Sequence, residues 1–392
     1  MDPFEISCQV SIKKTAARRL RQGHLWVYAG ELEIEPEDSD PPIVRVLDTS
    51  GNIVGYAFYS RLSQIRLRLI SRDRDPPTPE FFQKRIKDSV ARRRTLFEAG
   101  SACRLVFGEG DLLPGIIVDR YGSYLVLQTL SRGADAIKQP LVDILKDSLH
   151  PKGILQRNDI KARRLEGLEE IRSVVWGTVP EEIEITEDEL RFIVDLLRGQ
   201  KTGFFLDQRE NRINTKKYAS GQALDCFTNT GAFALQFARC CESVLAVDIS
   251  EESIQLARRN SELNGIQNID FKSGNVFDFL RELENAGRTF DIICLDPPAF
   301  AKNRKALSGA RSGYKEINLR AMKLLRSEGI LVTSSCSYHM LESDFLNLLC
   351  EAARDCHRNI QVLERRSQAS DHPMLVGMPE THYLKCFFLR VL

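Results

Sequence analysis

Four groups able to take part in chemistry follow four short apolar runs in the second half of the chain. The runs end in the turn at residues 227–231, on Asp248, on Asp296 and on Cys336. A glycine turn lets the backbone approach a ligand, carboxylates accept hydrogen bonds from hydroxyl and amine groups, and a thiolate is a nucleophile. Together these groups would suit the binding of a nucleoside and a covalent step on a second substrate.

The four apolar runs have the length of buried parallel strands. They cover residues 223–226, 243–247, 290–295 and 330–335, and segments of helical periodicity separate them. Ligands of such open sheets bind beyond the carboxyl ends of the strands, near the point where the strand order reverses. We therefore predict an α/β, doubly wound, Rossmann-like domain at residues 190–392, with all four strand ends at one pocket.

The turn and the first acid have the order expected of a nucleoside site. Backbone N–H groups around Gly231 could meet the carboxylate of a methionine moiety, and Asp248 could accept both hydroxyls of a ribose. Asn275 follows the next strand, where the amino group of an adenine could meet it. Nicotinamide enzymes share such an acid, so this part alone leaves the cofactor open.

The loop after residue 295 indicates a flat substrate. Asp296 is followed by Pro297 and Pro298, which have no N–H and leave carbonyl groups and the carboxylate exposed. Phe300 could stack on a planar ring. Such a loop is typical of methyltransferases that act on nitrogen or nucleobase targets.

Cys336 supplies a route to a carbon target. Carbon 5 of cytosine is a poor nucleophile, but a thiolate that adds at carbon 6 converts the ring to an enamine whose carbon 5 can attack a sulfonium methyl group. Asp296 could hold the nitrogen edge of the ring. Cys226 and Cys294 lie inside strands and are expected to be packed core, whereas Cys336 ends its strand.

Two other functions stay open on these residues. An enzyme of similar fold could methylate an exocyclic amine with the loop at 296–298 and no covalent cysteine. A non-catalytic RNA-binding or assembly factor could also retain the fold. A nicotinamide dehydrogenase is disfavoured because the chain lacks G-x-G-x-x-G at the expected place.

Composition indicates a cytoplasmic globular protein of more than one domain. The chain has 392 residues, of which 43% are hydrophobic and 28% charged, and no apolar run long enough to cross a membrane. Its ten cysteines contain no C-x-x-C pair, so we expect no metal site.

The net charge of +1 conceals basic segments that favour a nucleic-acid partner. Residues 11–24 carry five lysines and arginines and no acid. The loop at 301–315 is also basic and could hold the phosphates beside a flipped-out base. The residues that we expect to contact RNA are Lys13, Lys14, Arg18, Phe300, Lys302, Arg304 and Lys305.

The first half of the chain predicts two smaller domains. Short strands at 43–48, 55–59 and 65–70 indicate a β-rich unit at residues 1–75. A proline-rich linker follows, and residues 76–189 alternate helix and strand signals, including one helix at 134–149. We expect a middle α+β domain there.

Several motifs together resemble one known family. Gly23-His24-Leu25-Trp26-Val27-Tyr28 is similar to the PUA domain, a small RNA-binding barrel. That start, the segments at 109–115 and 202–209, Thr230-Gly231-Ala232-Phe233, Asp296-Pro297-Pro298 and Ser335-Cys336-Ser337 resemble the bacterial PUA-bearing cytosine-5 methyltransferases of large-subunit ribosomal RNA. The likeness covers nearly the whole chain.

The resemblance implies a class I methyltransferase that uses S-adenosylmethionine and an RNA cytosine, and it is compatible with a homodimer. Cys336 would be the nucleophile, assisted by Asp296. Asn229 and Asn275 depart from a frequent glycine and acid, and the proton-abstracting base is unassigned. The residues expected to contact the cofactor are Gln208, Asp225, Phe227, Thr230, Gly231, Asp248, Ile249, Asn275, Val276 and Asp296.

Overall fold

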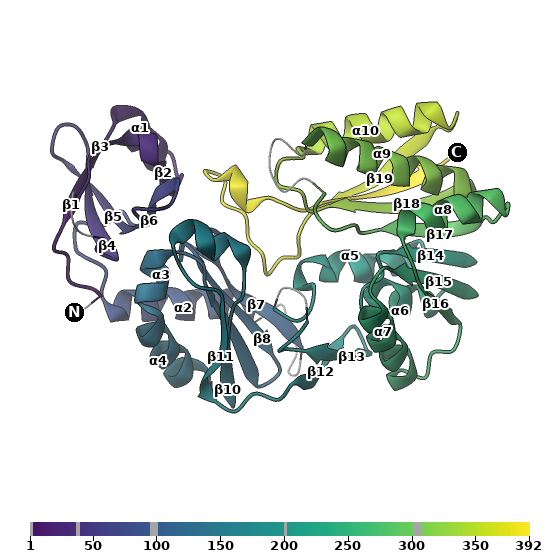
Figure 1. Ribbon diagram of the computed structural model, residues 1–392, viewed down its shortest axis with the longest axis horizontal. Helices are drawn as coiled ribbons and strands as arrows, with labels where there is room; N and C mark the ends of the chain where they lie inside the picture. Colours follow the sequence, from purple (N-terminus) through teal and green to yellow (C-terminus); the bar gives the residue numbers. More distant parts are fainter. Residues whose placement is uncertain (1–2, 37–39, 95–100, 200–201, 301–306) are drawn as a thin grey trace. The chain divides into compact units, whose positions relative to one another are not determined.

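The chain, seen here as a computed structural model, divides into two compact units (Figure 1). The structure describes residues 3–36, 40–94, 101–199, 202–300 and 307–392. Unit 1 comprises Met1–Ile185, Val194–Leu206 and Ser370–Thr381. Unit 2 comprises Thr186–Ile193, Asp207–Ala369 and His382–Leu392.

Unit 1 begins with a β-rich region, as predicted. Six strands in its described part form a sheet of order β2-β6-β5-β4-β1-β3. Alternate side chains of these strands pack with the apolar face of the helix α1 (Lys14–Arg21), where Ala16, Ala17 and Leu20 are buried. The strands are β1 (Gln9–Ile12), β2 (Trp26–Tyr28), β3 (Leu32–Ile34), β4 (Ile43–Leu47), β5 (Ile53–Tyr59) and β6 (Ile65–Ser71).

A second sheet of unit 1 has the order β11-β10-β9-β8-β7. Its strands are β7 (Ala102–Phe107), β8 (Ile116–Tyr121), β9 (Tyr124–Thr129), β10 (Gly153–Asn158) and β11 (Ile171–Gly177). The helices with it are α2 (Pro79–Arg93), α3 (Arg132–Ala136) and α4 (Lys138–Leu149). The single helix expected at 134–149 is therefore two, because Ile137 leaves helical geometry at φ −95° and ψ 13°.

The two sheets of unit 1 share one hydrophobic core. Phe58 of β5 stacks on Phe82 of α2 with ring centroids 6.1 Å apart. A Cβ at Gly133 would lie 2.5 Å from the ring of Phe58, so only glycine fits there. This common core explains why the regions 1–75 and 76–189, which the sequence separates, lie in one compact unit.

A late segment of the chain, Ser370–Thr381, also packs in unit 1. Met378 is fully buried in the core of the six-stranded sheet. A Cβ at Gly377 would approach the backbone of Gly23 at 2.7 Å, and Glu380 lies 3.3 Å from the ring of His24. The β-rich region is thus completed by residues that follow it by about three hundred positions in sequence.

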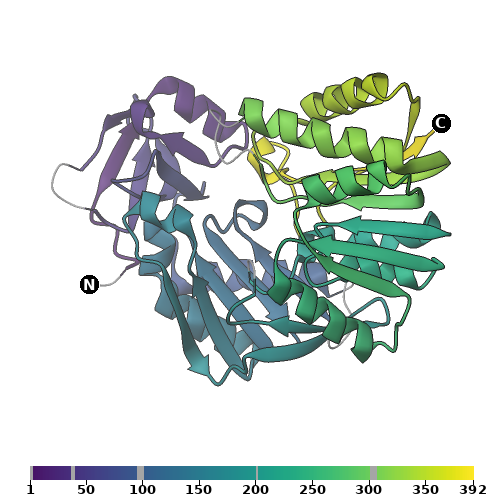
Figure 2. The same cartoon turned by 45° about the vertical axis from the view of Figure 1, so that its right-hand side comes forward.

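Unit 2 contains the predicted doubly wound sheet, of order β16-β15-β14-β17-β18-β20-β19 (Figure 2). The strands are β14 (Gln222–Cys226), β15 (Ser243–Asp248), β16 (Ile269–Ser273), β17 (Phe290–Leu295), β18 (Leu325–Ser335), β19 (Ile360–Arg366) and β20 (Lys385–Val391). The five from β14 to β18 are parallel, and β20 inserts antiparallel between β18 and β19. The order reverses at β14, which has β15 on one side and β17 on the other.

Helices cover both faces of this sheet (Figure 1). On one face lie α5 (Arg209–Asn214), α6 (Ala232–Ala238) and α7 (Glu251–Leu263). On the other lie α8 (Val276–Asn285), α9 (Leu307–Leu324) and α10 (Glu342–Asp355). A hairpin of β12 (Glu182–Glu187) and β13 (Leu190–Asp195) contributes Thr186–Ile193 to unit 2.

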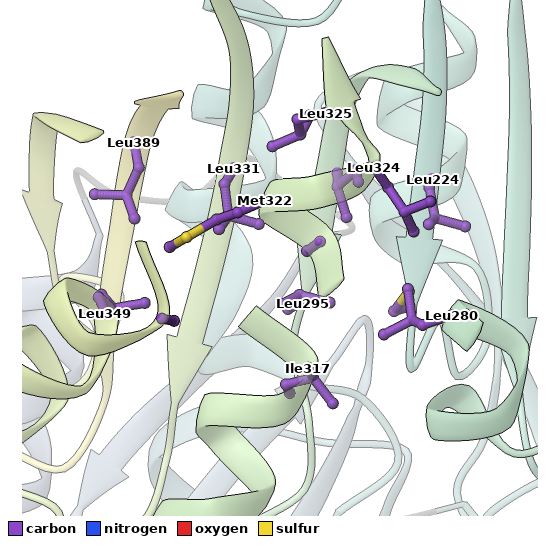
Figure 3. Packing of buried hydrophobic residues seen from close by; sticks show 14 of the residues in the cluster. Leu224, Leu280, Leu295, Ile317, Met322, Leu324, Leu325, Leu331, Leu349 and Leu389 are labelled. Carbon is purple, nitrogen blue, oxygen red and sulfur yellow. The ribbon is translucent and has the colours of Figure 1, made fainter. Parts of the chain in front are cut away.

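The core of unit 2 lies between its central strands and the helices α8, α9 and α10. Leu295 and Leu331 of neighbouring strands face Ile317 and Met322 of α9 (Figure 3). All four side chains are fully buried. Each large aliphatic side chain removed from water contributes about 1.5–3 kcal/mol, so this packing fixes the strands whose ends carry the chemical groups.

Candidate active site

Strand register aligns the predicted groups at one edge of unit 2. Cys226, the last residue of β14, is the Cα partner of Val247 and of Leu295, and Leu295 is the partner of Thr333. Asp248, the last residue of β15, and Asp296, the residue after β17, therefore lie at the same level, and Cys336 follows β18 two residues after Ser334. Four separate strands thus bring their ends together as the sequence predicted.

The turn after β14 has an unusual backbone. Phe227, Asn229 and Gly231 have φ values of 63°, 49° and 84°, which lie in the left-handed region. Only glycine adopts this conformation without strain. The N–H of Asn229 donates to Asp248 Oδ2 at 2.9 Å, and this bond ties the turn to the end of β15. The asparagine that stands in place of a frequent glycine is therefore held by the neighbouring acid.

Asp225 is fully buried in β14. Burial raises the pKa of its carboxyl to about 7, the Thr228 hydroxyl that donates to it at 2.5 Å opposes this rise, and the charge of Asp296 adds to it. A buried carboxyl with this pKa carries little negative charge below neutral pH. Through its hydrogen bond with Thr228, buried Asp225 holds the turn that follows β14.

The end of β15 is more open. Asp248 is partly exposed and also accepts the N–H of Ser250 at 3.0 Å, while the side chain of the next residue, Ile249, is 72% exposed. A carboxylate beside an exposed aliphatic group suits the ribose and the flat face of a nucleoside. Thr230 is partly exposed on the adjacent turn.

Asn275 and Val276 begin the helix α8. The side-chain oxygen of Asn275 accepts the N–H of Phe277 at 2.9 Å, so it caps the helix. Val276 is buried in the core of unit 2, so its backbone is the part that could reach a ligand. A Cβ at Gly274 would meet no atom within 4 Å, so the chain is open beside this cap.

Gln208 fixes the carboxylate of Asp296. Its Nε2 donates to Asp296 Oδ1 at 2.8 Å and to Ser334 Oγ at 3.1 Å, and its Oε1 accepts from Asn211 at 2.6 Å. Gln208 is buried at the end of a short helical turn before α5. The amide therefore orients the acid on the loop after β17.

Cys336 lies beside that same loop. Its Sγ is 3.9 Å from the carbonyl oxygen of Pro297, and the side chain is partly exposed. Cys226 and Cys294 are fully buried in their strands, as expected of packed core. The sulfur at 336 and the carboxylate at 296 thus belong to adjoining segments.

Phe300 packs among aromatic side chains of unit 2. Its ring centroid is 4.6 Å from that of Tyr314, 5.9 Å from Phe277 and 6.4 Å from Phe227. These contacts hold the loop after β17, and the stacking of a substrate on Phe300 stays a prediction. Three other predicted RNA contacts, Lys302, Arg304 and Lys305, lie outside the described residues.

Lys13, Lys14 and Arg18 belong to unit 1, where they are exposed on or beside α1. Lys13 Nζ donates to the carbonyl oxygen of Gly30 at 2.9 Å. Within the described part of the chain, Lys14 and Arg18 have no acidic partner, whereas Arg19 of the same helix pairs with Glu31. Two cations of α1 thus remain available to an anionic ligand.

Sequence interpretation missed three side chains at the edge of the unit 2 sheet. Tyr314 Oη lies 2.9 Å from Ser337 Oγ, Tyr383 Oη donates to Asp207 Oδ2 at 2.6 Å, and Lys385 Nζ donates to the carbonyl oxygen of Ser337 at 2.8 Å. The signal for Lys385 was a lysine at the start of an otherwise apolar strand.

Among the described residues, no three His, Cys, Asp or Glu side chains form a group that could hold a metal ion. None of the helices in those ranges has both the length and the apolar character needed to cross a membrane.

Two protein families match this chain, one near its start and one over its second half. Residues 10–72 match a PUA-like domain, and residues 170–387 match an S-adenosylmethionine-dependent methyltransferase. The ribosomal RNA large subunit methyltransferase I of Erwinia tasmaniensis is 38% identical over 400 residues, which are 99% of this chain and 100% of that protein. The protein of the same name from Tolumonas auensis is 39% identical over 401 residues, with the same coverage.

Solved structures share the fold over its full length. A methyltransferase chain complexed with SAH has a TM-score of 0.86 at 22% identity and covers 98% of this chain, which covers 100% of it. A structure from Streptococcus mutans has a TM-score of 0.84 at 21% identity, with coverage of 98% and 100%. The α/β sheet of unit 2 is thus the class I methyltransferase fold.

Proposed function

This chain belongs to the family of PUA-domain-bearing, S-adenosylmethionine-dependent methyltransferases, and we propose that it forms 5-methylcytosine in large-subunit ribosomal RNA through a covalent cysteine adduct. In this proposal residues 1–75 form a domain that binds RNA, and residues 190–392 form the domain that transfers the methyl group. Residues 76–189 form a middle domain that connects these two domains. A ribosomal RNA substrate implies that the protein acts in the cytoplasm.

The edge of the unit 2 sheet offers groups that fit the cofactor. Asp248 would accept the ribose hydroxyls, and exposed Ile249 would cover one face of the adenine. The turn from Phe227 to Gly231 would hold the methionine end, and the backbone of Asn275 would meet the adenine edge. When bound, S-adenosylmethionine supplies a methyl group on a positively charged sulfur.

Cys336 and Asp296 would share the work on the base. The thiolate sulfur of Cys336 forms a bond to carbon 6, and the electron pair of the C5–C6 double bond moves into the ring toward nitrogen 3. Asp296, oriented by Gln208, would meet the nitrogen 3 and amino edge, and a proton carried on its carboxyl group would pass to nitrogen 3 as negative charge develops there. Carbon 5 then acts as the nucleophile for methyl transfer. Loss of its proton restores the double bond and expels the cysteine as thiolate.

One observation favours methylation of carbon 5 over methylation of an exocyclic amine. Cys336 Sγ lies 3.9 Å from the carbonyl oxygen of Pro297, directly after the acid that would hold the base. An exocyclic-amine methyltransferase needs the acid and the proline loop but has no use for a sulfur beside them. The juxtaposition of these two segments therefore favours a carbon target.

A nucleoside assay tests the chemistry. Large-subunit ribosomal RNA from cells that lack the protein is incubated with the enzyme and S-adenosylmethionine, and its digested nucleosides are identified by mass spectrometry. We expect 5-methylcytidine as the new product. An N4-methylcytidine product would establish the amine alternative, and absence of cofactor binding by calorimetry would establish a non-catalytic factor.

A trapping experiment tests the covalent step. In RNA that carries 5-fluorocytidine, the fluorine at carbon 5 cannot be lost as a proton, so the cysteine is not expelled. We expect a stable protein–RNA adduct on the peptide that contains Cys336, and none with Cys336→Ala. Adduct formation on another cysteine would contradict the assigned nucleophile.

A further inference from the structure

Lys385 is a buried cation next to the segment that carries Cys336. It opens the antiparallel strand β20, pairs in register with Ser335 of β18, and is only 4% exposed. Its Nζ donates to the carbonyl oxygen of Ser337 at 2.8 Å and to that of Tyr383 at 2.9 Å. The backbone of Lys385 thus pairs with the residue before the cysteine, and its ammonium group binds the residue after the cysteine.

Few charges surround this lysine. Burial lowers the pKa of Lys385 to about 8, while the charges of Cys336 and of Glu342 at the start of α10 oppose the shift. Glu342 itself is partly exposed and lies 3.7 Å from Arg365. Another polar group near the cysteine is Tyr314, whose pKa burial raises, so its hydroxyl stays neutral. Among the described residues, the negative charges that act on Lys385 are thus those that Cys336 and Glu342 can carry.

A structural role alone explains this residue poorly. Two carbonyl oxygens could be satisfied by a neutral side chain, and a buried ammonium group is unfavourable unless an opposite charge compensates it. An ammonium has three N–H groups, and the two carbonyl groups use two of them. One N–H remains for the neighbouring sulfur.

We propose that the ammonium group of Lys385 is a positioning charge that keeps Cys336 in its thiolate form, an inference that rests on the covalent role proposed for Cys336. The S–H bond breaks with its electron pair kept on sulfur, and the proton leaves to solvent water. The same charge stabilises the sulfur a second time, when the bond to carbon 6 breaks and the cysteine is expelled. Lys385 acts through Cys336 and needs no contact with the base.

The pH dependence of thiol alkylation tests this directly. The full-length protein is treated with iodoacetamide over about pH 6 to 10, and the rate at each cysteine is read by peptide mass spectrometry. The exposed thiols of Cys240 and Cys350 serve as references within the same sample. We expect the midpoint for Cys336 to lie about one pH unit or more below theirs.

Two substitutions separate charge from structure. Lys385→Met keeps the length of the side chain and removes the charge, and we expect the Cys336 midpoint to rise by about one pH unit while those of Cys240 and Cys350 stay unchanged. Lys385→Arg keeps the charge and should restore the midpoint. The acidic limb of the methylation rate should move to higher pH in the Met variant alone.

Several results would overturn the inference. A wild-type Cys336 midpoint equal to the references would do so without any variant, even if Lys385→Met does not fold. A folded Met variant with a lowered melting temperature and an unmoved midpoint would assign Lys385 a purely structural role. Retained activity in Cys336→Ala would refute the proposed function. If the Cys336 midpoint of the wild-type protein is low in that case, the coupling between the lysine and the thiol still stands.

Discussion

The interior of the unit 2 sheet and its carboxyl edge contain the same residue types in different states. Cys226, Cys294 and Cys386 lie within strands and are fully buried, and burial raises the pKa of the Cys386 thiol to about 12. Cys336 lies just past the end of β18, partly exposed and close to a buried lysine. The same side chain is thus an inert core group at Cys386 and a candidate nucleophile at Cys336, two residues beyond the β18 partner of Cys386.

The acids repeat this contrast. Asp225 is buried within β14, and its pKa is raised to about 7, so it behaves as a neutral packing group over much of the acid range. Asp248 is the last residue of β15 and Asp296 follows β17, and both accept hydrogen bonds that hold a carboxylate in place. Position relative to the strand end decides which acids and thiols can meet a ligand.

The largest expected effect is the difference in methylation rate between substitution of the thiol at the sheet edge, Cys336, and substitution of a thiol in the interior, Cys386. Cys336→Ala should reduce methylation by about a thousandfold or more, because the covalent step is lost. Cys386→Ala, which removes a buried thiol from the neighbouring strand, should leave methylation within a few-fold and cost about 1–2 kcal/mol of stability. Initial rates with labelled cofactor and urea unfolding measure both. Equal losses of activity would remove the distinction between edge and interior.

A similar pair of substitutions is available for the acids of β17 and the loop that follows it. Asp296→Asn should lower the methylation rate by about a hundredfold or more, since an amide cannot pass a proton to nitrogen 3 of the base. The control is Asp291→Asn near the start of the strand, which weakens an ion pair with Arg326 far from the edge. That variant should methylate at nearly the normal rate. If both variants lost the same fraction of the methylation rate, the two acids would act by stabilising the fold and not by contact with the base.

Asp225, the acid in the interior of the sheet, should make the free energy of unfolding depend on pH. Because the folded-state pKa of Asp225 is raised from 3.8 to about 7, its contribution to stability is fully present below 3.8 and is lost as pH rises through about 7. Asp225→Asn removes this dependence. Between about pH 5 and pH 8, wild type should lose about 2 kcal/mol more than the variant in urea unfolding. Parallel losses would show that Asp225 titrates normally.

The smallest effect is expected in unit 1, where the charges are exposed. Replacing Lys14 and Arg18 by alanine should weaken binding of a ribosomal RNA fragment about tenfold and make the salt dependence shallower by roughly one for each phosphate group that is no longer bound. Lys87→Ala on α2 removes an equally exposed charge and is the control. Filter binding at several salt concentrations measures the slopes. Equal slopes for all variants would exclude α1 from the RNA-binding surface.

The strands of unit 2 were predictable because each is a short apolar run with a polar residue at its end. The runs ending at Cys226 and Leu295 form the strands expected, and the class I fold is confirmed. The β-rich start was also predicted correctly. Local pattern suffices where a strand is buried on both faces, since burial leaves a continuous apolar run.

Features that depend on distant parts of the chain were not predictable. Lys385 reaches the segment of Cys336 because β20 inserts antiparallel beside β18, a topology that no local pattern reports. The orientation of Asp296 by Gln208 depends equally on the folded arrangement, because 88 positions separate the two residues. The roles assigned to the site residues stay predictions until the substitutions above are measured.

Segment Ser370–Thr381 has a consequence for biosynthesis. Met378 belongs to the core of the six-stranded sheet, so this sheet lacks part of its interior until synthesis has passed that residue. A nascent or truncated chain that stops before residue 370 would expose the apolar surface that Met378 covers. The β-rich region is therefore not a detachable module, and its maturation waits for a segment translated some three hundred codons later.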